Sequence, residues 1–458
     1  MPGALTLAPR TGAAVSGRLP VAVPIHRAGF LAALLSGGDT RLAVDPLSGN
    51  NKYSCPPVPA PDLVSFASCT ASPVSQCGFE AAAQCYDTVG GAASWQRRSA
   101  RLEECQRGIQ EALLRHYGAA GLAEAILRPS GTDALLAAAL LVAAERPDIP
   151  LTAIIPAAAE TGTGVPLAAA CRQFDGPAAG TLLAGCPATV LEIPLRSDDG
   201  VPLGEDAVNS AFAAAARSVR GRAVICLTHG SKTGLVAPTS VPAHADVIVD
   251  ACQARIGPDA VAAYLRRGWP VVLTASKFFG GPAFAAALLL PRARVAAFRD
   301  WRMAPGGGTG TLGTVLRWTA ALGAIEAFGR ADGMADALLA CGAAVSRGLG
   351  SIPSLEQVGG LRRGGQGWDG LPSIFTFGVR DPADRKRLLT MAGLQPLHRR
   401  LVRDGVLLGQ PVSLGRFGGL RLAIGARNLL DGSWVCGLDR AFGALAEAAA
   451  TPVRCPRT

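Results

Sequence analysis

Residues 246–282 read DVIVDACQARIGPDAVAAYLRRGWPVVLTASKFFGGP, and this segment indicates a layered α/β fold. Two short apolar runs, 247–249 and 271–273, flank a segment long enough for one helix. Apolar runs without a polar face are typical of strands buried on both sides, and a helical crossover joins such strands in a parallel sheet. Polar residues follow each run: Asp250 after the first, Ser276 and Lys277 after the second. Because the carboxyl ends of parallel strands meet at one edge, we expect these side chains to face one crevice.

The same alternation continues along the chain on both sides of this segment. Strand-like runs occur at Leu151–Pro156, Ala188–Leu195, Ala223–Thr228, Asp246–Ala251, Pro270–Ala275 and Ala283–Leu290. Helical patterns cover 95–117, 131–145, 167–174, 205–219, 311–330 and 438–450. We therefore predict an α/β protein with a three-layer, mixed but mostly parallel sheet, helices on both faces, and a smaller α+β C-terminal domain. The predicted boundaries are an irregular N-terminal arm (1–95), a large domain (96–332) and a small domain (333–458).

Composition excludes several classes of protein. Of the 458 residues, 49% are hydrophobic and 17% charged, which suits a large buried core rather than a disordered chain. No apolar run reaches the roughly 18 residues of a membrane helix, so we expect a soluble protein. The net charge of +10 comes from scattered arginines with few aromatics (5%), which argues against a nucleic-acid partner. Twelve cysteines without CxxC spacing, and no secretion signal, favour reduced thiols in the cytoplasm and no metal site.

The sequence also predicts an anion-binding helix N-terminus in addition to the two polar strand ends. Ser130, Gly131 and Thr132 open the helix expected at 131–145, and hydroxyls and free amides at a helix N-terminus bind anions. Taken singly, these features are more often a helix cap, a turn carboxylate and a solvated lysine. Together they meet the needs of pyridoxal 5'-phosphate: an anion cradle, Asp250 for the pyridine nitrogen, and Lys277, one of four lysines in the chain, for the Schiff base.

At this point the sequence resembles a known group, the fold-type I pyridoxal-phosphate enzymes, and within them the class V aminotransferase and cysteine desulfurase-like superfamily. The resemblance runs from about residue 129 to 428 in the order of the family. The matching segments are PSGTDALL (129–136), THGSKTG (228–234), VIVDACQA (247–254), TASKFFGGP (274–282), GGGTGT (306–311) and LRLAIGARN (420–428).

The resemblance implies a role for each matching residue. Lys277 would form the Schiff base and move protons, Asp250 would pair with the pyridine nitrogen, and His229 would face the cofactor. Arg421 would hold the substrate α-carboxylate with its planar fork. The resemblance also implies a homodimer with shared sites, because threonines of one subunit reach the phosphate of the other. The implied cofactor contacts are Ser130, Gly131, Thr132, Gln253 near the phenolic oxygen, Ser276, Thr309 and Thr311.

The sequence departs from the family in three places. The family's ring-stacking aromatic or histidine is absent from IIPAAAETGTGVP (154–166), where Glu160 or Thr161 takes its place. The desulfurase nucleophile is absent from VLLGQPVSLG (406–415), and no cysteine lies between positions 341 and 436, so a persulfide-forming desulfurase is not expected. The N-terminal block has no counterpart: Asn51 is a candidate substrate contact or part of a packing arm. Lys232, near the cofactor in the resemblance, is a candidate ligand of a substrate anion.

We therefore expect an enzyme that forms an external aldimine with a small-molecule amino acid and carries out aminotransferase-like chemistry at the Cα–H bond. One alternative is β-elimination or β-replacement by a C–S lyase that uses only the cofactor. Another is a catalytically silent cofactor-binding partner, against which both Asp250 and Lys277 argue. A Rossmann-type nucleotide binder is disfavoured because GGGTGTLG (306–313) does not follow a strand-like run.

Overall fold

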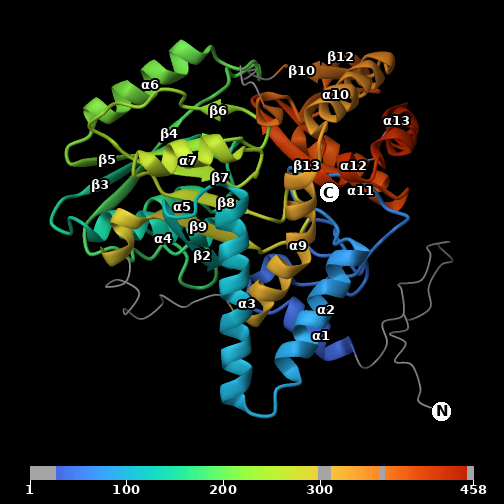
Figure 1. Ribbon diagram of the computed structural model, residues 1–458. Helices are drawn as coiled ribbons and strands as arrows, with labels where there is room; N and C mark the ends of the chain where they lie inside the picture. The colour runs from blue at the N-terminus through green and yellow to red at the C-terminus, as the bar shows by residue number, and fades with distance from the viewer. Residues whose placement is uncertain (1–26, 298–310, 360–366, 451–458) are drawn as a thin grey trace.

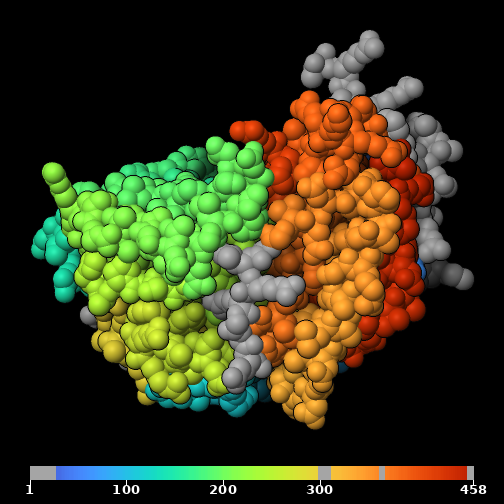
Figure 2. Space-filling view, turned by 90° about the horizontal axis from the view of Figure 1, so that it is seen from above, coloured from blue at the N-terminus to red at the C-terminus, as the bar shows by residue number. Residues whose placement is uncertain are grey.

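The computed structural model describes residues 27–297, 311–359 and 367–450. Two sheets organise these residues, and a group of long helices joins them (Figure 1). Seen from above, the C-terminal elements lie beside the elements of the large sheet as a second lobe (Figure 2).

The larger sheet has eight strands in the order β2-β9-β8-β7-β5-β3-β4, with β6 beside β5. Strands β8, β7, β5, β3 and β4 run parallel, β9 is antiparallel to both β8 and β2, and β6 is antiparallel to β5. The strand bounds are β2 (Ala123–Arg128), β3 (Leu151–Pro156), β4 (Ala188–Ile193), β5 (Arg222–His229), β6 (Val236–Ala237), β7 (Asp246–Ala251), β8 (Val271–Thr274) and β9 (Ala286–Pro291).

Helices cover both faces of this sheet, because its strands are apolar on both sides. In β8, Val271 and Leu273 enter one core and Val272 enters another, as the two-residue period of a strand requires. The core of Val272 contains nearly all of α4, whereas the core of Val271 contains residues of α3, α7 and α9. The helices of this part are α3 (Trp95–His116), α4 (Gly131–Ala144), α5 (Val165–Ala169), α6 (Glu205–Ser218), α7 (Pro258–Arg266), η3 (Arg292–Arg294) and α9 (Leu312–Arg330).

The second sheet has the order β1-β13-β14-β11-β10, with β12 beside β11. Its first strand comes from the N-terminal segment and pairs in parallel with β13, Val64 opposite Val406. The strands are β1 (Val64–Phe66), β10 (Leu355–Val358), β11 (Ile374–Asp381), β12 (Asp384–Leu388), β13 (Val406–Leu414) and β14 (Phe417–Ala423). The helices are α10 (Met334–Ser351), η4 (Trp368–Gly370), α11 (Met391–Arg403), α12 (Ala426–Leu430) and α13 (Trp434–Ala450).

The predicted fold class is confirmed, and most predicted strands and helices differ from the observed ones by only a few residues. Two predictions are wrong. The helix expected at 167–174 is a five-residue turn of helix, α5. The N-terminal arm, expected to be irregular, contains α1 (Ala28–Leu34), η2 (Thr40–Leu42), β1 and the fifteen-residue α2 (Gln76–Gly90). Helix α2 begins with Ser75 as N-cap and packs its apolar side against α9.

Arg317 of α9 attaches the N-terminal segment to the large sheet. Its fully buried guanidinium donates to the backbone oxygens of Leu34 (2.5 Å), Ser36 (2.8 Å) and Phe284 (2.8 Å). Burial lowers the pKa of this arginine to about 9. These contacts place η2 beside the loop that follows Lys277. No helix among the described residues has the length and apolarity to span a membrane.

Candidate active site

The structure brings Asp250 and Lys277 to the same edge of the large sheet. Asp250 lies near the end of β7, paired with Val272 of the adjacent β8, and Lys277 follows β8 by three residues. One oxygen of Asp250 accepts a hydrogen bond from the backbone N–H of Cys252 at 3.0 Å. The Lys277 ammonium makes no hydrogen bond or ion pair with any residue in the described ranges, although the side chain is half-buried. Lys277 is therefore free to bond to a ligand.

The N-terminus of α4 lies at the same edge. Ser130 is its N-cap: the Ser130 hydroxyl accepts from the Asp133 N–H and donates to the Asp133 carboxylate, which in turn accepts from the Ser130 N–H. The side chain of Ser130 is thus used within the helix cap. The hydroxyls of Thr132 and Ser276, whose residues are 9% and 8% exposed, form no hydrogen bond within the described part of the chain.

Gly131, the first residue of α4, allows a close approach to the Asp250 strand. A Cβ at this position would stand 2.4 Å from the Sγ of Cys252. Burial and the charge of Asp250 raise the pKa of the Cys252 thiol well above its ordinary value, so the sulfur is a neutral packing group. A side chain at position 131 would push α4 away from the strand end and open the cradle.

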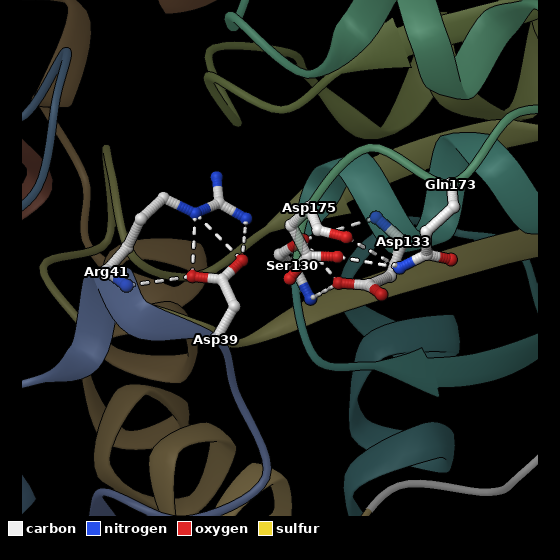
Figure 3. Close-up of polar contacts among 6 residues, drawn as sticks. All are labelled: Asp39, Arg41, Ser130, Asp133, Gln173 and Asp175. Atoms are coloured by element: carbon white, nitrogen blue, oxygen red, sulfur yellow. Dashed lines mark hydrogen bonds and ion pairs between the residues drawn. The ribbon is translucent and has the colours of Figure 1, made fainter. Parts of the chain in front are cut away.

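The N-terminal segment places Arg41 beside the N-terminus of α4, and Arg41 was not among the predicted site residues (Figure 3). Figure 3 shows the Asp39–Arg41 pair of η2 beside the Ser130–Asp133 cap. The Arg41 Nε lies 2.9 Å from Asp39, and its guanidinium covers the ring of Phe284 at 4.8 Å. The positive charge of Arg41 partly offsets the rise that burial causes in the pKa of Asp133. No local pattern identifies Arg41, because its position depends on how the arm docks.

His229 and Gln253 are both held by neighbouring groups. His229, at the end of β5 and 2% exposed, shares a hydrogen bond of 3.1 Å between its Nδ1 and the hydroxyl of Tyr264. Gln253 donates from Nε2 to the backbone oxygen of Cys69 (3.0 Å) and accepts from Arg255 (2.9 Å). One Nε2 proton of Gln253 remains for a ligand. Their roles toward the cofactor stay predictions.

Glu160 and Thr161 have different environments. Glu160 is 3% exposed and binds Arg196 at 2.6 Å, while the hydroxyls of Ser231 and Thr233 donate to its second oxygen at 2.6 and 2.7 Å. Its carboxylate is thus fully occupied within the protein. The Thr161 hydroxyl is buried and has no partner among the described residues. Thr161 is therefore the stronger candidate for contact with the ring of a cofactor.

Arg421 and Lys232 lie next to each other, and the charge of Lys277 acts on Lys232. The terminal nitrogens of Arg421 donate to the backbone oxygens of Lys232 (2.9 Å) and Gln410 (2.6 Å) and to the hydroxyl of Thr70 (3.0 Å). Its Nε is buried without a partner in the described residues. The Lys232 ammonium donates to the backbone oxygen of Ala158 at 3.0 Å. Burial and the charges of Arg421 and Lys277 lower the pKa of Lys232 to about 8.

The remaining predicted residues are Asn51, Thr309 and Thr311. The side-chain oxygen of Asn51 accepts from the N–H groups of Tyr53 (2.9 Å) and Cys55 (3.2 Å), so its contacts are those of a turn in the packing arm. Thr309 lies outside the described residues. Thr311 is the N-cap of α9, and its hydroxyl packs against Gly37 of the same chain.

A buried cysteine, Cys69, lies next to Gly409 in the structure. Gly409 of β13 lies opposite Arg421, and a Cβ on Gly409 would stand 2.5 Å from the Sγ of Cys69. Cys69 is a free thiol, 2% exposed, from the segment after β1. Cys69 is far from Gly409 along the chain, whereas the β1–β13 pairing brings the two close in space.

No protein-family model and no curated protein sequence matches this chain. Solved structures do match. Cysteine desulfurase CsdA from Escherichia coli superposes with a TM-score of 0.55 at 16% identity, covering 84% of this chain and 94% of the other. A NifS-like protein superposes with a TM-score of 0.54 at 13% identity, covering 84% and 100%.

The chain has the fold of a cysteine desulfurase. At these identities the likeness establishes the fold, and it confirms the fold type that the sequence resemblance predicted.

The groups at the sheet edge fit pyridoxal phosphate. Thr132 and Ser276 offer unpaired hydroxyls beside the free amides of α4, which suits a phosphate. Asp250 accepts from the Cys252 N–H and also contacts the Cys252 thiol, and a carboxylate at this strand end suits a protonated pyridine nitrogen. Lys277 supplies an uncommitted amine. No group in this set conflicts with the cofactor.

Proposed function

We propose that the chain is an enzyme that binds pyridoxal 5'-phosphate through Lys277 and acts on an amino acid. The observation that carries this proposal is the placement of Asp250 and Lys277 at adjacent strand ends, beside the unpaired hydroxyls of Thr132 and Ser276. Buried hydroxyls without a hydrogen-bond partner are costly, and those of Thr132 and Ser276 have none among the described residues. A bound phosphate would remove this cost.

The reaction we propose is aminotransferase-like chemistry at the Cα–H bond. Bound pyridoxal phosphate supplies an aldehyde for the substrate amine and an electron sink for the Cα carbanion. Asp250 would hold the ring nitrogen in its protonated form, and the Lys277 amine would accept the proton from the substrate Cα. Arg421 binds the α-carboxylate through its unpaired Nε. Because Arg421 would hold the carboxylate in place, the Cα–H bond is favoured as the one that breaks. Transamination is therefore favoured over decarboxylation.

Cys69 supports a second candidate, a C–S lyase that transfers sulfur. One solved structure of similar fold is named a cysteine desulfurase, and Cys69 places a thiol beside Gly409 and Arg421. In that reaction an S–S bond forms at Cys69, the Cβ–S bond of substrate cysteine breaks, and the freed Cβ gains a proton. Cysteine would then leave as alanine, and Cys69 would carry a persulfide.

Absorbance spectra test the proposal. Wild type, Lys277→Ala and the matched surface control Lys386→Ala are incubated with pyridoxal phosphate and scanned before and after each amino acid is added. We expect a visible band in wild type and Lys386→Ala that is lost in Lys277→Ala. Formation of pyridoxamine phosphate supports transamination, whereas alanine formation from cysteine, abolished in Cys69→Ser, supports sulfur transfer. A colourless wild type overturns the cofactor assignment.

The functional unit we propose is a homodimer in which Thr309 and Thr311 of one subunit approach the phosphate of the other. Its test is the mass in solution by analytical ultracentrifugation, together with the cofactor affinity of Thr309→Val. A monomer with full cofactor affinity would refute shared sites.

A further inference from the structure

Besides Lys277 and Arg255, two cations of the site, Arg421 and Lys232, have no anionic partner among the described residues. Arg421 is 3% exposed, and its Nε forms no hydrogen bond among the described residues. Lys232 uses one of its three ammonium protons on the backbone oxygen of Ala158. Neither residue forms an ion pair in the ranges that the structure describes. Arg421 donates to the Lys232 backbone oxygen at 2.9 Å, so the Arg421 guanidinium is attached to the turn that carries Lys232.

The nearby carboxylates are committed elsewhere. Glu160 acts on Lys232 through its charge, but it is neutralised by Arg196 at 2.6 Å and accepts from two hydroxyls. Asp250 lies at the strand end, where its charge acts on Cys252 and Cys226. Lys277 would bond to the cofactor, and Arg255 uses its guanidinium on Ser373, Gln253 and Ser68. Arg421 and Lys232 therefore remain to be neutralised, and the α-carboxylate of an amino acid neutralises one of them. A buried cation without a counter-charge is unfavourable.

We propose that Lys232 binds a second anionic group on the substrate, so that the site takes amino acids with an acidic side chain. This inference rests on the proposed function, since it assigns the α-carboxylate to Arg421. The lowered pKa of Lys232, about 8, agrees with a cation that lies among other cations. The cofactor phosphate is the competing anion, but Thr132, Ser276 and the amides of α4 offer it a separate cradle.

The test compares two ligands that have the same number of carbons, the dicarboxylate succinate and the monocarboxylate butyrate. Each is titrated into cofactor-loaded protein, and the change in cofactor absorbance gives the dissociation constant. The variants are Lys232→Gln, which removes the charge, Lys232→Arg, which keeps it, and the exposed control Lys386→Gln. We expect wild type to bind succinate about tenfold or more tightly than butyrate. The ratio falls to near one in Lys232→Gln, is largely kept in Lys232→Arg, and is unchanged in Lys386→Gln.

Equal binding of succinate and butyrate by wild type, or an unchanged affinity ratio in Lys232→Gln, would overturn the inference that Lys232 binds a second anionic group. The proposed function would still stand in that case, provided that wild type shows the visible cofactor band. A Lys232→Gln variant that loses cofactor and keeps its succinate preference would assign Lys232 to the phosphate instead. If no cofactor binds to wild type, the proposed function fails. The shift in thermal unfolding caused by succinate relative to butyrate then decides the Lys232 site alone.

Discussion

Substitution of Glu160 by glutamine tests the network that holds the Lys232 turn. Glu160 binds Arg196 at 2.6 Å, with side chains only 3% and 7% exposed, and accepts from Ser231 and Thr233. Its backbone oxygen also accepts from the Lys232 N–H at 2.8 Å. Glutamine retains the size but removes the charge and one acceptor oxygen. Breaking one side of a buried pair costs about 3–5 kcal/mol, because the other charge stays buried. We therefore expect the free energy of unfolding to fall by that amount.

The assay is equilibrium urea unfolding followed by far-UV circular dichroism, with Glu356→Gln as the matched control. Glu356 binds Arg380 at 2.7 Å, but their side chains are 48% and 35% exposed. An exposed pair contributes at most about 1 kcal/mol, so the control should stay near wild type. The double variant Glu160→Gln/Arg196→Met should recover part of the loss. If Glu160→Gln is no less stable than Glu356→Gln, the reasoning about this network is refuted.

Three further predictions concern the sheet edge and the Lys232 turn. Thr132→Val and Ser276→Ala should each weaken pyridoxal phosphate binding about tenfold, because each removes a hydrogen bond to a charged group; unchanged affinity in equilibrium dialysis would contradict the cradle. Ser130→Ala should lower the free energy of unfolding by about 1 kcal/mol through loss of the N-cap, with cofactor affinity nearly unchanged, and a large loss of affinity would make Ser130 a ligand. Succinate affinity should fall above pH 8, by about tenfold per pH unit, since Lys232 has a pKa of about 8 and binds only as a cation. A decline that begins above pH 10 would show an ordinary lysine.

The large sheet was predictable because its information is local. Each parallel strand is an apolar run of limited length, and the polar residue that ends it, such as Asp250 or Lys277, lies at the carboxyl edge by the rules of parallel sheets. The positions of Thr132 and Ser276 follow from the same rules. The short length of α5 was not predictable from its apolar residues, since the helix ends before Cys171, whose positive φ of 55° no local sequence pattern shows.

The contribution of the N-terminal segment could not be read from local pattern. Thr70 and Cys69 reach Arg421 and Gly409 because β1 pairs with β13, a contact between Val64 and Val406. A three-residue strand carries too little periodicity to show its partner. The absence of a cysteine between positions 341 and 436 therefore did not show that Cys69 lies next to Gly409 in space.

The polar network around Glu160 is more than a source of stability. A well-packed apolar pair in place of Glu160 and Arg196 would stabilise the fold about as well, because a buried ion pair repays little more than its desolvation cost. An apolar pair, however, would not accept from the hydroxyls of Ser231 and Thr233, which fix the turn on both sides of Lys232. It would also remove the negative charge that raises the pKa of Lys232 against burial and its cationic neighbours. The network therefore does two things that packing alone does not: it fixes the position of the Lys232 ammonium and helps to keep it charged near neutral pH.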